Sequence, residues 1–157
     1  MYRKTAQGKG RVILAMALVI CIVIVVMLKM SAMFSADKQA VAVVEDFYRF
    51  EQKGEFSASW QLFHSTMKER FTKGFYIQDR AHVFMNHFGV ESFEFSMSEP
   101  EQIKQWKMSK TGPAMKNVYK ILVTQTYKGK YGNFNLEQEA YVVKEKEKWK
   151  VVWDYNQ

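Results

Sequence analysis

Several residue types and motifs are rare or missing in this sequence, and each absence narrows what the protein can be. Its 157 residues include a single cysteine, Cys21, so the chain forms no internal disulfide. A domain without disulfides depends on its hydrophobic core, and aromatic residues, 15% of the chain, supply large side chains for one. Neither Gly-x-Ser-x-Gly nor a phosphate-binding glycine loop occurs, so the signatures of α/β-hydrolases and nucleotide-binding folds are missing.

Acidic residues are absent from residues 1–36, and charge of either sign is absent from residues 12–28. As a helix, residues 12–28 cover about 25 Å. If Lys29 snorkels, apolar character continues to Phe34 and extends this to the roughly 30 Å of a bilayer's hydrocarbon core. We therefore predict a transmembrane anchor at residues 12–34 that contacts the lipid bilayer.

The flanks of this anchor predict its orientation. The tail, residues 1–11, carries four basic residues, and positive charge stays on the cytoplasmic side. We expect a cytoplasmic tail and an extracytoplasmic domain at residues 37–157. The alternative is a cleaved signal peptide, but its apolar region is usually about 7–15 residues long and ends at a small-x-small site. Here the run is longer, and the nearest Ala-x-Ala downstream of it, at residues 40–42, lies in a predicted helix.

The excess of positive charge belongs mainly to the tail. The net charge is +7, but five of the 23 basic residues lie in residues 1–36, which leaves 18 basic against 16 acidic residues beyond them. This distribution predicts no nucleic-acid-binding surface on the outer domain.

Three helices are predicted at the start of the outer domain. Residues 37–53 place Ala40, Val43, Phe47 and Phe50 on one face, and Gly54 can end the helix. A second helix starts at Ser57 and continues through Met67, and a third covers about 76–88, with Gly89 at its C-terminal end.

After Gly89 the apolar period changes from that of helices to that of strands. Strands are predicted at residues 93–97, 103–108, 117–128 and 133–144, followed by one that places Trp149, Val151, Trp153 and Tyr155 on one face. Residues 129–132 and the charged run 144–148 predict the hairpin connections. Strands that follow helices indicate an α+β fold, with helices packed on one face of a curved, mainly antiparallel sheet.

The outer domain carries a pattern of core and turn residues at Phe47-Tyr48, Lys53-Gly54-Glu55-Phe56, Phe71 to Phe88, and Glu147 to Asp154. In this pattern it resembles the nuclear transport factor 2-like superfamily and, within it, the N-terminal domain of MecA-type penicillin-binding proteins of methicillin resistance. The resemblance implies a cone of three helices on a strongly bent sheet. It also implies a non-catalytic spacer or interaction module between a membrane anchor and a transpeptidase. Since the sequence stops at Gln157, we expect no transpeptidase activity and a spacer that acts in trans.

Polar residues give little indication of catalysis or metal binding. His82 and His87 are about 140° apart on a helix, and His64 lies elsewhere, so no metal site is predicted. Asp46, Asp79 and Asp154 have no evident acid–base partner. We predict no catalytic residue and no cofactor.

Aromatic residues are the remaining candidates for a binding site. They are Tyr48, Trp60, Phe84, Phe88, Trp106, Tyr119, Tyr141 and Trp153, which either line a ligand cavity or simply form the core.

Three functions remain open. The first is an interaction or scaffold module of the bacterial cell envelope, linked to cell-wall synthesis, that binds an envelope protein or itself. The second is an assembly component of a conjugative or secretion apparatus. The third is a small-molecule binder, or an enzyme of isomerase or dehydratase type, with a hollow cone.

Overall fold

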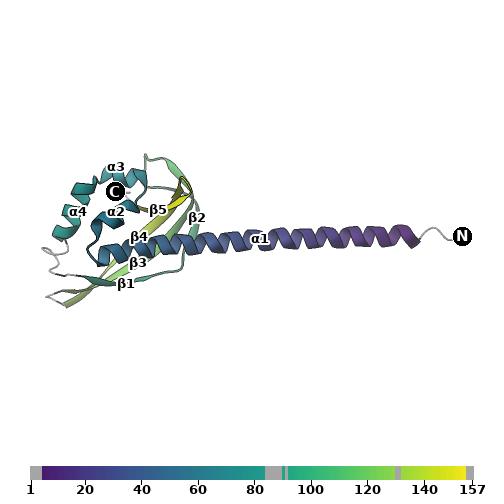
Figure 1. Ribbon diagram of the computed structural model, residues 1–157, viewed down its shortest axis with the longest axis horizontal. Coiled ribbons are helices and arrows are strands. Elements are labelled where there is room, and N and C mark those ends of the chain that lie inside the picture. The colour runs from purple at the N-terminus through teal and green to yellow at the C-terminus, as the bar shows by residue number, and fades with distance from the viewer. Residues whose placement is uncertain (1–4, 84–89, 91, 130–131, 155–157) are drawn as a thin grey trace. The chain divides into compact units, whose positions relative to one another are not determined.

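The computed structural model describes residues 5–83, 90, 92–129 and 132–154 of the protein (Figure 1). Contacts divide the chain into two compact units, Met1–Ala36 and Asp37–Gln157, called here the N-terminal and C-terminal units. Helix α1 begins at Thr5 and ends at Gln52, so it contributes residues to both units.

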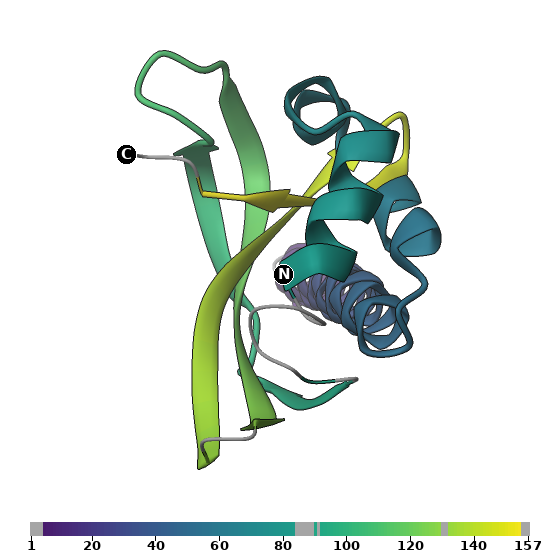
Figure 2. The same ribbon diagram turned by 90° about the vertical axis from the view of Figure 1, so that its left-hand side faces the viewer.

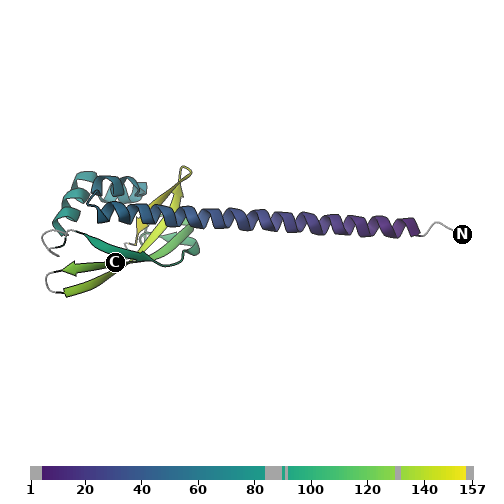
Figure 3. The same ribbon diagram turned by 60° about the horizontal axis from the view of Figure 1, so that its bottom comes forward.

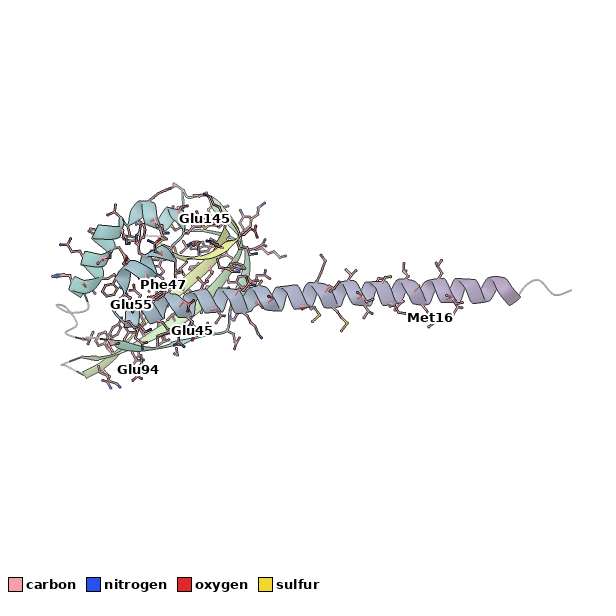
Figure 4. All side chains as sticks on the ribbon, in the orientation of Figure 1. Met16, Glu45, Phe47, Glu55, Glu94 and Glu145 are labelled. Atoms are coloured by element: carbon pink, nitrogen blue, oxygen red, sulfur yellow. The ribbon has the colours of Figure 1, made fainter. Side chains whose placement is uncertain are left out.

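The N-terminal unit is helical and apolar. In the described part of the chain, one helix near the N-terminus is long and apolar enough to cross a membrane. Its described apolar side chains, from Val12 to Met30, are exposed, and Figure 4 shows side chains both above and below this helix near Met16. Lipid would cover an apolar surface of this kind without the free-energy cost that water imposes.

The described residues of the C-terminal unit form four helical segments, whereas three helices were predicted. They are the end of α1, α2 (Phe56–Gln61), α3 (Ser65–Arg70) and α4 (Lys73–His82). The predicted second helix is broken because Phe63 forms a parallel bridge with Val151. In this bridge His64 N donates to Val151 O at 3.0 Å, and Val151 N donates to Leu62 O at 2.9 Å. The strand thus takes up the N–H of His64 and the carbonyl of Leu62, which a continuing helix would use, whereas the N–H groups of Leu62 and Phe63 still donate within the preceding turn.

The third predicted helix is also displaced. Helix α4 starts at Lys73, before the predicted start near residue 76, and includes Gly74. The predicted end of this helix, residues 84–89, lies outside the described residues.

The buried face of α1 differs slightly from the predicted one. Ala40, Val44, Phe47 and Glu51, at spacings of 4, 3 and 4, are buried, whereas Val43 and Phe50 are half-buried. Gly54 ends the helix as predicted: it has φ of 71°, and the next residue, Glu55, donates its N–H to Phe50 O at 2.8 Å. This is the Schellman arrangement, in which a left-handed glycine closes a helix.

The strands form one antiparallel sheet, which confirms the α+β fold class. Their order is β1-β3-β4-β5, and β2 also pairs with β3. In Figure 2 helices α2, α3 and α4 lie on one side of this sheet. Figure 3 shows β3 and β4 as a long hairpin whose outer end extends beyond β5. The strands are β1 (Phe93–Met97), β2 (Glu101–Lys107), β3 (Ala114–Gly129), β4 (Gly132–Glu145) and β5 (Lys148–Trp153).

Aromatic rings fill the space between the helices and the sheet. Phe63 lies 5.0 Å from Phe47 of α1, 5.2 Å from Tyr76 of α4 and 4.9 Å from Trp153 of β5, measured between ring centroids. The predicted alternation of β3 is confirmed, since Tyr119, Ile121, Val123 and Tyr127 are buried on one face.

Candidate functional site

Four polar side chains meet inside the C-terminal unit. The carboxylate of Glu51 at the end of α1 is completely buried, and each of its oxygens receives two donors. Oε1 accepts hydrogen bonds from Tyr76 Oη at 2.7 Å and from Ser59 Oγ. Oε2 accepts from Arg80 Nε and lies 2.6 Å from Arg80 Nη2.

Local sequence spacing brings these residues together. Glu51 continues the buried stripe of α1 one turn beyond Phe47, while Tyr76 and Arg80 are four residues apart on α4 and therefore share a face. Ser59 comes from α2, so three helices contribute to the cluster. Sequence reasoning missed Glu51 and Arg80. The sequence feature that could have indicated their burial is that each is a charged residue at the helical spacing of the buried side chains on its helix.

Burial and the charge of Glu51 shift the pKa of Tyr76 in the same direction and that of Arg80 in opposite directions. Burial, together with the adjacent carboxylate of Glu51, raises the pKa of Tyr76 far above its usual value of 10.0. For Arg80, burial by itself lowers the pKa, but the attraction of Glu51 outweighs it, and the net pKa is raised. Arg80 therefore stays charged, and Tyr76 stays a hydroxyl donor.

The saturation of Glu51 determines what the cluster can do chemically. A general base needs a free lone pair directed at the proton that it removes, whereas this carboxylate already receives four donor contacts. The cluster therefore ties the ends of α1, α2 and α4 together.

A second polar layer lies on the sheet. Tyr48 Oη donates to Gln138 Oε1 at 2.9 Å, and Tyr127 Oη donates to Gln125 Oε1 at 2.8 Å. Burial raises the pKa of both phenols. Among the described residues, the buried Gln125 Nε2 has no hydrogen-bond partner.

The structure separates the aromatic residues that were predicted to line a site. Tyr48 and Trp153 both contact Phe47 in the core, at 5.2 and 5.7 Å between ring centroids. The four other described candidates have different partners: Trp106 stacks on Tyr141 at 4.1 Å, Tyr119 lies edge-on to Trp149 at 5.3 Å, and Trp60 Nε1 donates to Phe71 O at 2.8 Å. Phe84 and Phe88 lie outside the described residues.

The described histidine and aspartate candidates, residues 46, 64, 79, 82 and 154, form no common site. His64 caps α3, since its Nδ1 accepts the Thr66 N–H at 3.2 Å, and burial lowers its pKa. His82 and the three aspartates, Asp46, Asp79 and Asp154, are exposed, and His87 lies outside the described residues. Among the described residues, no three His, Cys, Asp or Glu side chains gather in a metal-binding group.

Ser65 and Lys68 have the Ser-x-x-Lys spacing of serine acyl-enzymes, a feature that sequence reasoning also missed. Lys68 Nζ donates to Gln61 O at 3.1 Å and lies 4.8 Å from the ring centroid of Trp60. Ser65 hydrogen-bonds to Glu145 and thereby lowers the pKa of that carboxyl. Each side chain thus has a different partner, so this pair lacks the contact that acyl transfer requires.

Two open depressions lie where the end of α1 meets β1. One, of about 240 Å³, is lined by Gln52, Ser92, Phe93, Glu94, Thr126 and Lys128. The other, of about 440 Å³, is lined by Glu45, Arg49, Gln52 and residues 94–97. Gln52 Nε2 donates to Phe93 O at 2.7 Å and holds the strand against the helix. Both hollows are wide and partly polar, unlike the enclosed apolar pockets typical of small-molecule sites.

Exposed apolar side chains of the C-terminal unit gather on one element. Among the described residues from 37 onward, the large exposed apolar side chains are Phe75, Leu122, Phe134 and Leu136, and the last three belong to the β3–β4 hairpin. Phe134 stacks on Tyr127 at 5.0 Å and still exposes 37% of its surface, and Leu136 exposes 41%.

Comparison with known proteins adds a partial structural likeness. No family model and no curated protein matches the chain. One solved structure to which it is similar is Bd1075 of Bdellovibrio bacteriovorus, at 11% identity and a TM-score of 0.45. The match covers 69% of this chain and 36% of that one, so this chain corresponds to about a third of the length of Bd1075.

Proposed function

We propose that the protein is a single-pass membrane protein of the bacterial cell envelope, with a cytoplasmic N-terminus and a non-catalytic interaction module outside the membrane. Its partner is an envelope protein, and cell-wall synthesis is the setting. The resemblance of residues 37–157 to nuclear transport factor 2-like domains, and to the N-terminal domain of MecA-type penicillin-binding proteins, supports the setting at the level of fold analogy.

The charge distribution supports the membrane topology. The apolar segment of α1 follows a tail with four basic and no acidic residues, and such tails stay in the cytoplasm. The C-terminal unit then lies on the other side, and it has no cysteine that an oxidising compartment would pair.

The observation that carries the proposal is a pair of exposed apolar side chains, Phe134 and Leu136, which share one face of the β3–β4 hairpin. Soluble surfaces avoid contiguous apolar patches unless a partner covers them. The interior of the unit, by contrast, contains packed rings and a saturated carboxylate. The surface of the hairpin is therefore a better candidate for function than the interior.

Site-specific photo-crosslinking in intact cells tests this proposal. A photoreactive amino acid replaces Leu136 in the tagged full-length chain, and the matched control carries it at Phe75, an exposed apolar residue of α4 outside the hairpin. We expect Leu136 to capture a partner protein that Phe75 does not capture.

The identity of the captured protein distinguishes the settings. Penicillin-binding or division proteins support the cell-wall setting, and transfer or secretion proteins support an assembly role instead. Equal capture at both positions, or none at Leu136, contradicts an interaction module that acts through the hairpin.

A further inference from the structure

The outer half of β4 pairs on one side only among the described strands. Strand β3 pairs with β4 from Gly132 to Val142, whereas β5 pairs with β4 only from Ala140 to Glu145. In Figure 2 the outer half of β4 lies at the margin of the sheet, with β3 beside it. A sheet edge of this kind presents backbone donors and acceptors to another strand.

The side chains of this edge protect it only through two carboxylates, Glu137 and Glu139. Proteins usually blunt an exposed edge with lysine, proline or a bulge, but residues 132–143 contain no lysine, arginine or proline. Phe134 and Leu136 lie on the same face of the strand, where Phe134 is opposite Tyr127 and Leu136 is opposite Gln125 of β3. The other face carries Asn133, Asn135 and Glu137.

We propose that the occupant of this edge is a second copy of the chain, paired antiparallel about a twofold axis at Asn135. The sheets of the two copies then join by strand addition. The inference rests on the proposed function, because it identifies the partner of the same hairpin.

We chose Asn135 for the twofold axis by comparing which side chains of the two copies lie opposite one another in each possible register. With the axis there, Phe134 faces the partner's Leu136, and this apolar pair occurs twice. Asn133 faces the partner's Glu137, so an amide can donate to a carboxylate. No like charges oppose each other, and among the described strands only β3 pairs with residues 132–138, because β5 begins to pair at Ala140.

The neighbouring registers are less favourable. An axis at Glu137 sets two carboxylates directly opposite each other, which destabilises a strand pair. With the axis at Leu136, Phe134 lies opposite the partner's Gln138. The partner strand then also reaches Glu139, next to Ala140, where pairing with β5 begins. If one strand is shifted by a single residue relative to the other, Phe134 and Leu136 each face a polar residue of the partner, and both apolar pairs are lost.

Disulfide crosslinking of the full-length chain in membranes tests the register. In a Cys21→Ser background, Asn135→Cys places two thiols across the twofold axis, within reach of a disulfide. The matched control is Glu137→Cys, on the same face of the same strand. Its two thiols lie four residues apart along the strands, about 13 Å, which is too far for a disulfide.

We expect oxidation to convert Asn135→Cys into a covalent dimer at least tenfold more efficiently than Glu137→Cys. Co-expressed Asn133→Cys and Glu137→Cys chains should link to each other. Adding Leu136→Asp to Asn135→Cys should lower the dimer yield at least tenfold, whereas adding Phe75→Asp should leave it unchanged.

Three results overturn the inference: no dimer from Asn135→Cys in a chain that keeps its native tryptophan fluorescence, equal dimer from Glu137→Cys, or no effect of Leu136→Asp. If the dimer fails but photo-crosslinking at Leu136 captures another protein, the proposed function stands and the inference falls. If both fail, both are wrong.

Discussion

Replacing the buried Arg80 by methionine should destabilise the C-terminal unit much more than the same replacement of an exposed arginine. The substitution keeps much of the apolar stem but removes the cation that neutralises Glu51. Since the side chain of Glu51 has no exposed surface and that of Arg80 exposes 17%, water cannot replace the lost partner fully. The carboxylate then remains buried with only the hydroxyls of Ser59 and Tyr76.

The expected size of the effect follows from that burial. Removing one partner of a buried ion pair costs about 3–5 kcal/mol, a large part of the roughly 5–15 kcal/mol that stabilises a domain. For a unit of about 120 residues, the entropy of unfolding is about 0.25 kcal/mol per degree near the midpoint. Arg80→Met should therefore lower Tm by about 12–20 °C.

Thermal unfolding of the full-length chain in detergent, followed by tryptophan fluorescence, measures this change, because all four tryptophans lie in the C-terminal unit. The control is Arg49→Met, which breaks the exposed pair with Glu45 on α1, where Arg49 is 59% exposed, and should shift Tm little. The double variant Glu51→Gln/Arg80→Met removes both charges and keeps an acceptor for Tyr76, so it should recover at least about 1–2 kcal/mol. If Arg80→Met lowers Tm no more than Arg49→Met, or if the double variant recovers nothing, the reasoning is refuted.

Two further predictions concern pH and the β4–β5 turn. The folded state raises the pKa of the buried Tyr48 and Tyr76 above 10.0, so the unfolded state loses these protons first, and each phenol should reduce stability by about 1.4 kcal/mol per pH unit above 10. Urea midpoints at pH 9 and pH 11 check this, and Tyr76→Phe should show a smaller difference between them. Glu147 has φ of 65° in the turn, so Glu147→Gly should relieve strain and raise stability by about 0.5–1 kcal/mol, measured as a higher urea midpoint without a change in slope. Lys110→Gly, outside this turn, should give no such increase.

Features that depend on neighbours in sequence could be predicted from the residues alone. The apolar segment of α1 was evident because every residue from Val12 to Leu28 is apolar. The strand from Phe93 to Met97, the buried face of β3 and the charged turn at Lys146 were also predicted correctly, since alternation and turn composition are local signals.

Features that depend on residues distant in sequence were missed. Local spacing favours one helix from Ser57 through Met67, but hydrogen bonds to Val151 break it at Phe63, and no pattern near residue 63 indicates a strand residue 88 positions away. The phase of the α1 stripe was set one residue too early because Val43 and Val44 are equally apolar, and only packing against the sheet distinguishes them.

The buried cluster around Glu51 shows most clearly the difference between what local sequence indicates and what only tertiary packing decides. The sequence by itself placed Glu51 and Arg80 on helices, but an isolated glutamate or arginine on a helix is usually solvated. Their burial is stable only because the folded chain brings Arg80 within 2.6 Å of a carboxylate that also accepts the hydroxyl of Tyr76. Burial of a charge depends on its partner, and the partner here is 29 residues away, where only tertiary packing can bring the two together.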